Sequence, residues 1–204
     1  IIEPDKPIVI GPAQVANQPL TIGMPIDQAQ AGMHEITITA ADAAGTLYDP
    51  SGLDVPALLE ARDRFGEVDR GQVPARVQQL PREAVVTADV DVLIPAAVSF
   101  AITPREAADV KARLLVEAAN TPVTPEAEAV LAWRGIPVIP DFVANAGAAA
   151  WAWWLLLGRV DADPVRSFQV LKEEMQAKVP LLLAAWEEEG ITPREAALRL
   201  AQQQ

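Results

Sequence analysis

The chain alternates short, continuous apolar runs with longer stretches whose apolar residues recur at helical spacing. Most of the short runs are apolar at consecutive positions rather than at every second one, which is typical of strands covered on both faces. We predict six strands from these runs: Ile8–Ile10, Leu20–Met24, Glu35–Thr39, Val92–Pro95, Leu114–Glu117 and Val138–Pro140.

The stretches between and after these runs carry helix start signals. A Ser/Thr/Asp residue precedes the first turn in most of them, and such residues accept hydrogen bonds from free backbone N–H groups. The pentapeptide Thr-Pro-Arg-Glu-Ala occurs twice, at Thr103–Ala107 and Thr192–Ala196, and we interpret both copies as ordinary N-caps. The predicted helices are Val55–Phe65, Pro104–Lys111, Pro125–Arg134, Asn145–Leu157 (expected to be buried), Val165–Ala177, Lys178–Glu189 and Pro193–Gln203.

Strand and helix in alternation predict an α/β fold, a parallel sheet with helices on both faces. The chain then ends in helices only. We expect a single domain over residues 1–204, with an α/β core at residues 32–147 and C-terminal helices at residues 148–204.

The composition excludes several classes of partner and of functional site. The net charge of -12 argues against nucleic acid and anionic membranes as main partners, because phosphates would be repelled. With no cysteine and only His34 as histidine, thiol chemistry and a two-histidine zinc site are excluded, and we predict no metal site. The longest apolar run, Ala144–Leu157, is too short for a membrane span. We expect a soluble, cytoplasmic protein, and the start at Ile1 suggests a processed or partial chain.

Three segments carry a specific resemblance. Val116–Gly147 reads VEAANTPVTPEAEAVLAWRGIPVIPDFVANAG, Asp91–Ala97 reads DVLIPAA, and Asp42–Leu53 reads DAAGTLYDPSGL. Together they resemble the C-terminal nucleotide-binding domain of the glutamate dehydrogenase family (Glu/Leu/Phe/Val dehydrogenases), over most of Gly32–Gln204. The resemblance implies a Rossmann-like fold, NAD or NADP as cofactor, reversible oxidative deamination of glutamate to 2-oxoglutarate, and a homo-oligomer.

Two asparagines are candidates for the nicotinamide side of such a site. Asn120 directly follows a predicted strand, at the sheet edge where α/β proteins bind ligands, and its amide can both donate and accept. It could equally cap the next turn. Asn145 begins a predicted apolar helix, so an N-cap role is the favoured alternative there. Ala96 lies in the segment that resembles the strand before the family's nicotinamide pocket.

Asp42 is the candidate for the ribose. A carboxylate at the end of the second strand can accept from both ribose hydroxyls in dinucleotide-binding folds. The alternative is an Asx turn before Gly45.

The sequence departs from the family pattern in its first unit. A dinucleotide site needs a Gly-x-Gly-x-x-Gly turn opening a helix. Only Gly23 stands at the expected place, and eight residues separate it from Gly32. Asp27 would also repel a pyrophosphate. We therefore predict a degenerate or truncated first βα unit at residues 1–31, with Gly23 as its remaining cofactor contact.

Further departures concern the chemistry. Phe100 stands where the family has an asparagine facing nicotinamide, and Ala148, Ala149 and Ala152 replace its Gly-Val-x-x-Ser segment. The resemblance implies that the family's catalytic domain precedes the position of Lys6, so we expect this domain to be absent here and predict no catalytic residue.

Two hypotheses follow. The chain is the cofactor domain of an NAD(P)-dependent glutamate dehydrogenase, inactive alone. Otherwise it is a degenerate relative that acts as a regulatory or interaction subunit, in association with a dehydrogenase subunit.

Overall fold

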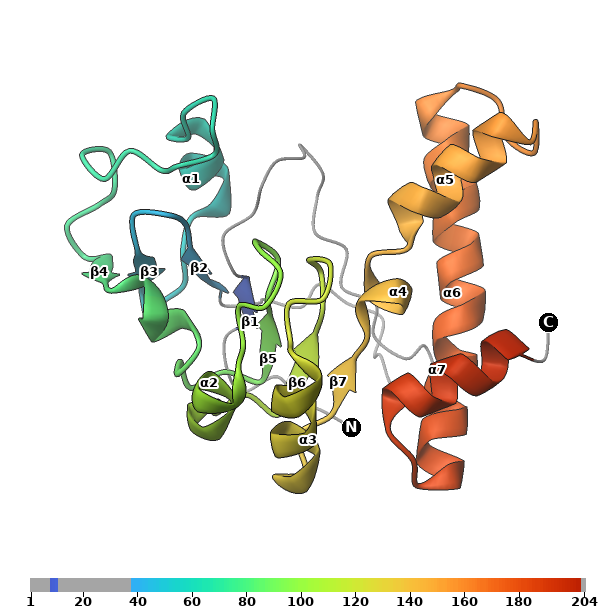
Figure 1. The fold of residues 1–204 in the computed structure, drawn as a ribbon. Coiled ribbons are helices and arrows are strands. Elements are labelled where there is room, and N and C mark those ends of the chain that lie inside the picture. The colour runs from blue at the N-terminus through green and yellow to red at the C-terminus, as the bar shows by residue number, and fades with distance from the viewer. Residues whose placement is uncertain (1–7, 11–37, 203–204) are drawn as a thin grey trace.

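A mixed seven-stranded sheet forms the centre of the computed structural model, which describes residues 8–10 and 38–202 (Figure 1). The strand order is β4-β3-β2-β1-β5-β6-β7. From β2 to β7 all neighbours are parallel, as the apolar runs predicted. The strands are β1 (Ile8–Ile10), β2 (Ile38–Ala41), β3 (Thr46–Tyr48), β4 (Gln78–Leu80), β5 (Val92–Ile94), β6 (Leu114–Val116) and β7 (Val138–Ile139).

The strand β1 lies between β2 and β5, with Ile8 opposite Ile38 on one side and Val92 on the other. This is the central place of the first strand in a doubly wound sheet. Residues 11–37 separate β1 from β2 and lie outside the described residues, together with the predicted strand Leu20–Met24, Gly23, Asp27 and His34. The truncated first unit therefore stays a prediction.

The antiparallel edge formed by β3 and β4 was not predicted. The chain reverses at Asp42–Gly45, where the Asp42 backbone N–H donates to the Gly45 carbonyl at 3.0 Å. Gly45 has φ +150°, and a Cβ there would lie 2.6 Å from the Leu80 carbonyl oxygen of β4. The close approach of β4 thus depends on glycine at the turn.

The helices before residue 140 begin where their caps predicted. Asp54 accepts from the Ala57 N–H at 3.0 Å at the start of α1 (Val55–Glu60), which ends earlier than expected. The capping box of Thr103 and Glu106 starts α2 (Pro104–Asp109), and Thr124 caps α3 (Pro125–Trp133). A short 3₁₀ helix, η1 (Arg82–Val85), precedes β5. The main core lies where α2 and α3 cover the strands, and it includes Leu93, Ile102, Leu115 and Leu131.

The C-terminal helices differ from two predictions. The helices expected on either side of residue 177 form one helix, α6 (Pro164–Glu189), which continues through Pro180. The stretch Asn145–Leu157, expected to be one buried helix, forms α5 (Gly147–Leu156), which has no buried residue. The short helix α4 (Asp141–Ala144) precedes it and was not predicted. Trp153 is 63% exposed and Leu156 77% exposed, because α5 packs mainly on α6.

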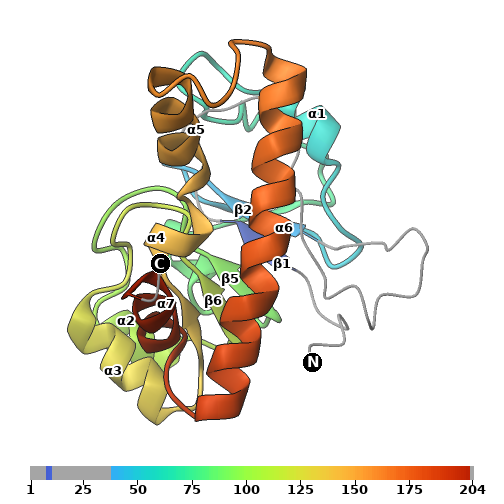
Figure 2. The same ribbon diagram turned by 90° about the vertical axis from the view of Figure 1, so that its right-hand side faces the viewer.

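The helix α6 runs alongside the sheet and extends beyond it, with α5 near one end (Figure 2). α7 (Pro193–Gln202) packs on the other part of α6 and also contacts β7. Its apolar stripe is partly as predicted, because Ala196 and Ala197 are buried while Leu198 is 49% exposed. Within the described part of the chain, no helix combines the length and hydropathy needed to cross a membrane.

Candidate functional site

The loops that follow β5 and β6 are joined to each other at the carboxyl edge of the sheet. The Pro95 carbonyl, one residue past β5, accepts from the N–H groups of Ala118 and Ala119 at 3.2 and 2.9 Å. Further along the two loops, the Phe100 N–H donates to the Thr121 carbonyl at 2.8 Å. Ligands of open α/β sheets bind at this edge.

Strained backbone occurs in these same two loops. Phe100 has φ +58° and Thr121 has φ +48°, and no other non-glycine residue of the described ranges has a positive φ. Such conformations cost of the order of 1–3 kcal/mol and concentrate at ligand sites. Phe100 is 62% exposed at this edge. Its ring therefore faces solvent.

The two candidate asparagines meet here. The Asn145 amide nitrogen donates to the Asn120 Oδ1 at 2.9 Å and lies 3.4 Å from the Ala118 carbonyl oxygen. The N-cap role suggested for Asn145 is wrong: the residue ends α4, and Ala146 precedes α5 without any side-chain cap. The side chain is thus free to reach across to the β6 loop.

Asn120 is exposed, and its backbone carbonyl accepts from the Ser99 hydroxyl at 2.6 Å. Its side-chain nitrogen donates to no residue of the described ranges, so both N–H donors of this amide remain at the sheet edge. Ala96 is half-buried and directly follows Pro95, which binds the start of the Asn120 loop. The structure therefore brings Ala96, Asn120 and Asn145 to one edge, although their roles toward a cofactor stay predictions.

Asp42 has the contacts of an Asx turn. Its Oδ1 accepts from the N–H groups of Ala44 and Gly45 at 2.9 and 3.1 Å and forms an ion pair with Arg70. Among the residues that the structure describes, its Oδ2 accepts only from the Val68 N–H, at 2.9 Å. Since a carboxylate offers about four lone-pair sites, Oδ2 keeps one for a further donor.

Sequence reasoning missed the most buried charge at this edge, Glu117. It directly follows β6, and its side chain is 0% exposed. Its Oε1 accepts from the Val123 N–H at 3.2 Å, and its Oε2 from the Asp141 N–H and from Arg194 Nη2, both at 2.9 Å. Burial raises the pKa of Glu117, against the hydrogen bond from Asp141 and the charge of Arg194.

Arg194 belongs to α7 and also binds Glu128 of α3, with Nε 2.7 Å from its Oε2. Its partial desolvation is outweighed by Glu128 and Glu117, which together raise the pKa of Arg194. A glutamate after an apolar strand is a signal that sequence analysis could have used. Its partner lies 77 residues away in the chain and gives no such signal.

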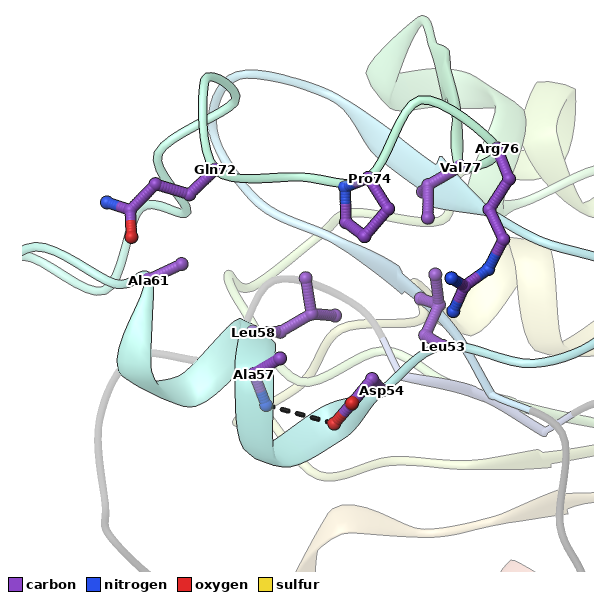
Figure 3. Close-up of a pocket in the computed structure, with 9 residues that line it drawn as sticks. All are labelled: Leu53, Asp54, Ala57, Leu58, Ala61, Gln72, Pro74, Arg76 and Val77. Carbon is purple, nitrogen blue, oxygen red and sulfur yellow. Dashed lines mark hydrogen bonds between the residues drawn. The ribbon is translucent and has the colours of Figure 1, made fainter.

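A separate hollow lies between α1 and the segment before β4 (Figure 3). Leu58, Pro74 and Val77 face one another across it. Its one carboxylate, Asp54, caps α1, and its arginine, Arg76, is paired with Asp49 at 2.8 Å. None of the candidate site residues lines it, so we interpret it as packing of α1 against the loop.

The comparison with protein families covers the residues at the carboxyl edge. The family described as Glutamate/Leucine/Phenylalanine/Valine dehydrogenase matches residues 23–204. This chain belongs to that family. The likeness extends from before β2 to the end of α7, and so it includes both loops of the amide pair.

Individual relatives are glutamate dehydrogenases. The chain is 45% identical over 106 residues to the NAD-specific glutamate dehydrogenase of Staphylococcus aureus (strain COL), covering 52% of this chain and 25% of the relative. It is 42% identical over 110 residues to NADP-specific glutamate dehydrogenase A1 of Halobacterium salinarum, covering 54% and 26%. The chain thus spans about a quarter of these relatives' length.

Among solved structures, the hetero-hexameric glutamate dehydrogenase of Thermus thermophilus superposes with a TM-score of 0.67 at 29% identity. The match covers 81% of this chain and 39% of that one. L-tryptophan dehydrogenase from Nostoc punctiforme has the same fold, with a TM-score of 0.59 at 22% identity over 83% of this chain and 44% of that one.

Proposed function

We propose that this chain is the nucleotide-binding part of an NAD(P)-dependent glutamate dehydrogenase, which interconverts glutamate with 2-oxoglutarate and ammonia. The observation that carries the proposal is the contact between Asn120 and Asn145, which come from different loops and meet at the carboxyl edge of the parallel strands. Family membership supports the reaction class, and the relatives include both NAD-specific and NADP-specific enzymes. A cytoplasmic location accompanies this proposal.

The residues at the edge fit the nicotinamide end of a dinucleotide. A carboxamide both donates and accepts, and the Asn120 amide can match either function. Ala96 leaves room beside it, since its side chain is a single methyl. The remaining lone pair on Asp42 Oδ2 fits one ribose hydroxyl, with Arg70 and the turn N–H groups holding the carboxylate in place. When bound, the cofactor supplies the hydride acceptor.

We assign no proton-transfer group to this chain. The two carboxylates closest to the amide pair along the chain, Glu117 and Asp141, are both occupied. Glu117 is ion-paired with Arg194, and Asp141 accepts from the N–H groups of Thr121 and Phe142 at 2.8 Å. Catalysis therefore requires residues from the part of the family that this chain does not cover.

The test is a titration of the chain with NADH and, separately, with NADPH, followed by calorimetry and by NADH fluorescence. We expect a Kd tighter than about 1 mM, roughly -4 kcal/mol, for at least one of them. Asn120→Ala should weaken binding, whereas Gln169→Ala, which removes an exposed amide on α6, should leave it unchanged. Absence of binding of both nucleotides by the wild-type chain would refute the proposal.

The second hypothesis, association with a dehydrogenase subunit, is favoured by the surface of α5. This helix carries no charged residue, and it exposes Trp151, Trp153 and Leu156. Large exposed apolar patches mark interaction sites. We propose that the occupant is dehydrogenase polypeptide from the part of the family outside this match, which is most of the Thermus thermophilus chain.

Two measurements test this association. Light scattering after gel filtration gives the mass of the chain alone and mixed with a full-length glutamate dehydrogenase. We expect the chain and the dehydrogenase to form a mixed complex. The dehydrogenase should turn over faster or more slowly in this complex than alone, as expected of an enzyme bound to a regulatory subunit. If the chain changes neither the elution of the dehydrogenase nor its rate, the proposal is contradicted.

A further inference from the structure

The Glu117 carboxylate connects two segments that otherwise leave the sheet in different directions. Oε1 accepts from Val123, at the end of the loop that follows β6, at 3.2 Å. Oε2 accepts from Asp141, the first residue of α4, at 2.9 Å. Each oxygen therefore holds a different segment, and the side chain spans the space between them.

These two segments carry the amide pair. Asn120 lies in the loop between Glu117 and Val123, and Asn145 ends the short helix that Asp141 begins, its N–H donating to the Asp141 carbonyl at 2.8 Å. A second bond joins the same segments, because the Asp141 side chain accepts from the Thr121 N–H at 2.8 Å. The distance between the two amides is thus set by the contacts that Glu117 and Asp141 make with the two segments.

Arg194 provides the charge that Glu117 needs in its buried position. An ionised carboxylate without a partner is costly to bury, and Arg194 Nη2 lies 2.9 Å from Oε2. Arg194 is itself held by Glu128 through Nε. The Glu128 side chain, however, makes no hydrogen bond to the described residues of either segment of the amide pair. Substitution of Glu128 therefore separates the effect of the ion-pair network from that of Glu117.

We propose that Glu117 is a positioning residue for the Asn120–Asn145 pair, fixing the α4 segment against the β6 loop so that both amides face one ligand. This inference rests on the proposed function only for the identity of that ligand. It concerns the geometry of the chain itself. The geometry can therefore be measured without nucleotide.

The experiment compares Glu117→Gln with Glu128→Gln in the full chain. In Glu117→Gln the side-chain NH₂ cannot accept, so one of the two backbone N–H groups loses its acceptor. The readout is the Asn145 side-chain NH₂ signal in ¹⁵N–¹H spectra, identified by its loss in Asn145→Ala. We expect the signal to shift and its solvent exchange to quicken in Glu117→Gln, and to remain as in the wild type in Glu128→Gln.

Glu117→Asp is the second variant, in case the glutamine variant does not fold. It keeps a carboxylate for Arg194 but is one methylene too short to span Val123 and Asp141, so it should change the Asn145 signal in the same direction. An unchanged signal in the folded Glu117 variants overturns the proposal, and so does an equal change in Glu128→Gln.

NADH binding separates this proposal from the proposed function. If the wild-type chain binds NADH, Glu117→Gln should weaken the Kd about tenfold or more, because the two amides no longer face the same ligand. If the wild-type chain binds no nucleotide, the proposed function fails while the NMR comparison still decides the role of Glu117. Unchanged NADH affinity in a folded Glu117→Gln chain counts against the proposal.

Discussion

Arg194→Met tests how much the contact between α7 and the sheet contributes to the free energy of unfolding. The substitution keeps much of the apolar stem but removes the guanidinium, which binds Glu117 and Glu128. Breaking a buried ion pair by removing one partner costs about 3–5 kcal/mol, because the other charge is left uncompensated. Glu117 is fully buried but keeps two backbone donors, and Arg194 is 29% exposed. We therefore expect a loss at the lower end, about 3 kcal/mol.

The chain contains its own matched control. Arg105 follows the same Thr-Pro pair as Arg194 but is exposed on α2, so Arg105→Met should change stability by less than about 0.5 kcal/mol. Urea unfolding followed by tryptophan fluorescence gives both values, provided that the m-value is unchanged. A loss below about 1 kcal/mol for Arg194→Met, the range of a surface pair, would refute the reasoning.

Three further predictions follow from single contacts. Gly45→Ala places a Cβ 2.6 Å from the Leu80 carbonyl at φ +150°, and should cost at least about 2 kcal/mol in urea unfolding; a loss below about 1 kcal/mol would contradict it. The hydrogen bond from the Thr103 hydroxyl lowers the pKa of Glu106, so its stabilisation is present above the ordinary value of 4.5 and is lost as the pH falls through the lowered pKa. Glu106→Gln should therefore cost about 1 kcal/mol at pH 7 and progressively less below pH 4.5, and a difference from the wild type that does not depend on pH would argue against this. Leu156→Lys on α5 should leave the unfolding free energy within about 0.5 kcal/mol but weaken any complex with a dehydrogenase subunit, as light scattering would show; equal complex formation would exclude this surface.

The parallel part of the sheet could be predicted because its signal is local. The apolar runs of β5, β6 and β7 contain only buried or half-buried residues, and the caps of the following helices are close to them in sequence. The antiparallel edge could not be predicted in this way. Gln78–Leu80 has no apolar pattern, and it is a strand because it pairs with Thr46–Tyr48. That pairing depends on the tertiary position of the Asp42–Gly45 turn.

The prediction that α5 is buried was made from its hydropathy, and this prediction was wrong for a related reason. Its sequence shows only that the helix is apolar, not what lies beside it. Asn145 shows the same limitation, since an asparagine before an apolar helix resembles an N-cap until the position of Asn120 is known. In both cases the missing information is the identity of the neighbour across space.

The two copies of the pentapeptide share their local contacts but differ in their neighbours across space. In Thr103–Ala107 and in Thr192–Ala196 the threonine and glutamate make the same capping contacts, as local sequence predicts. The arginine between them differs: Arg105 is exposed, while Arg194 faces the buried Glu117 at the end of β6. Because that glutamate also holds the β6 loop and α4, it connects the C-terminal helix to the amide pair. A change in the packing of α7 on α6 should then reach the Asn120–Asn145 pair, and we expect Arg194 to transmit it.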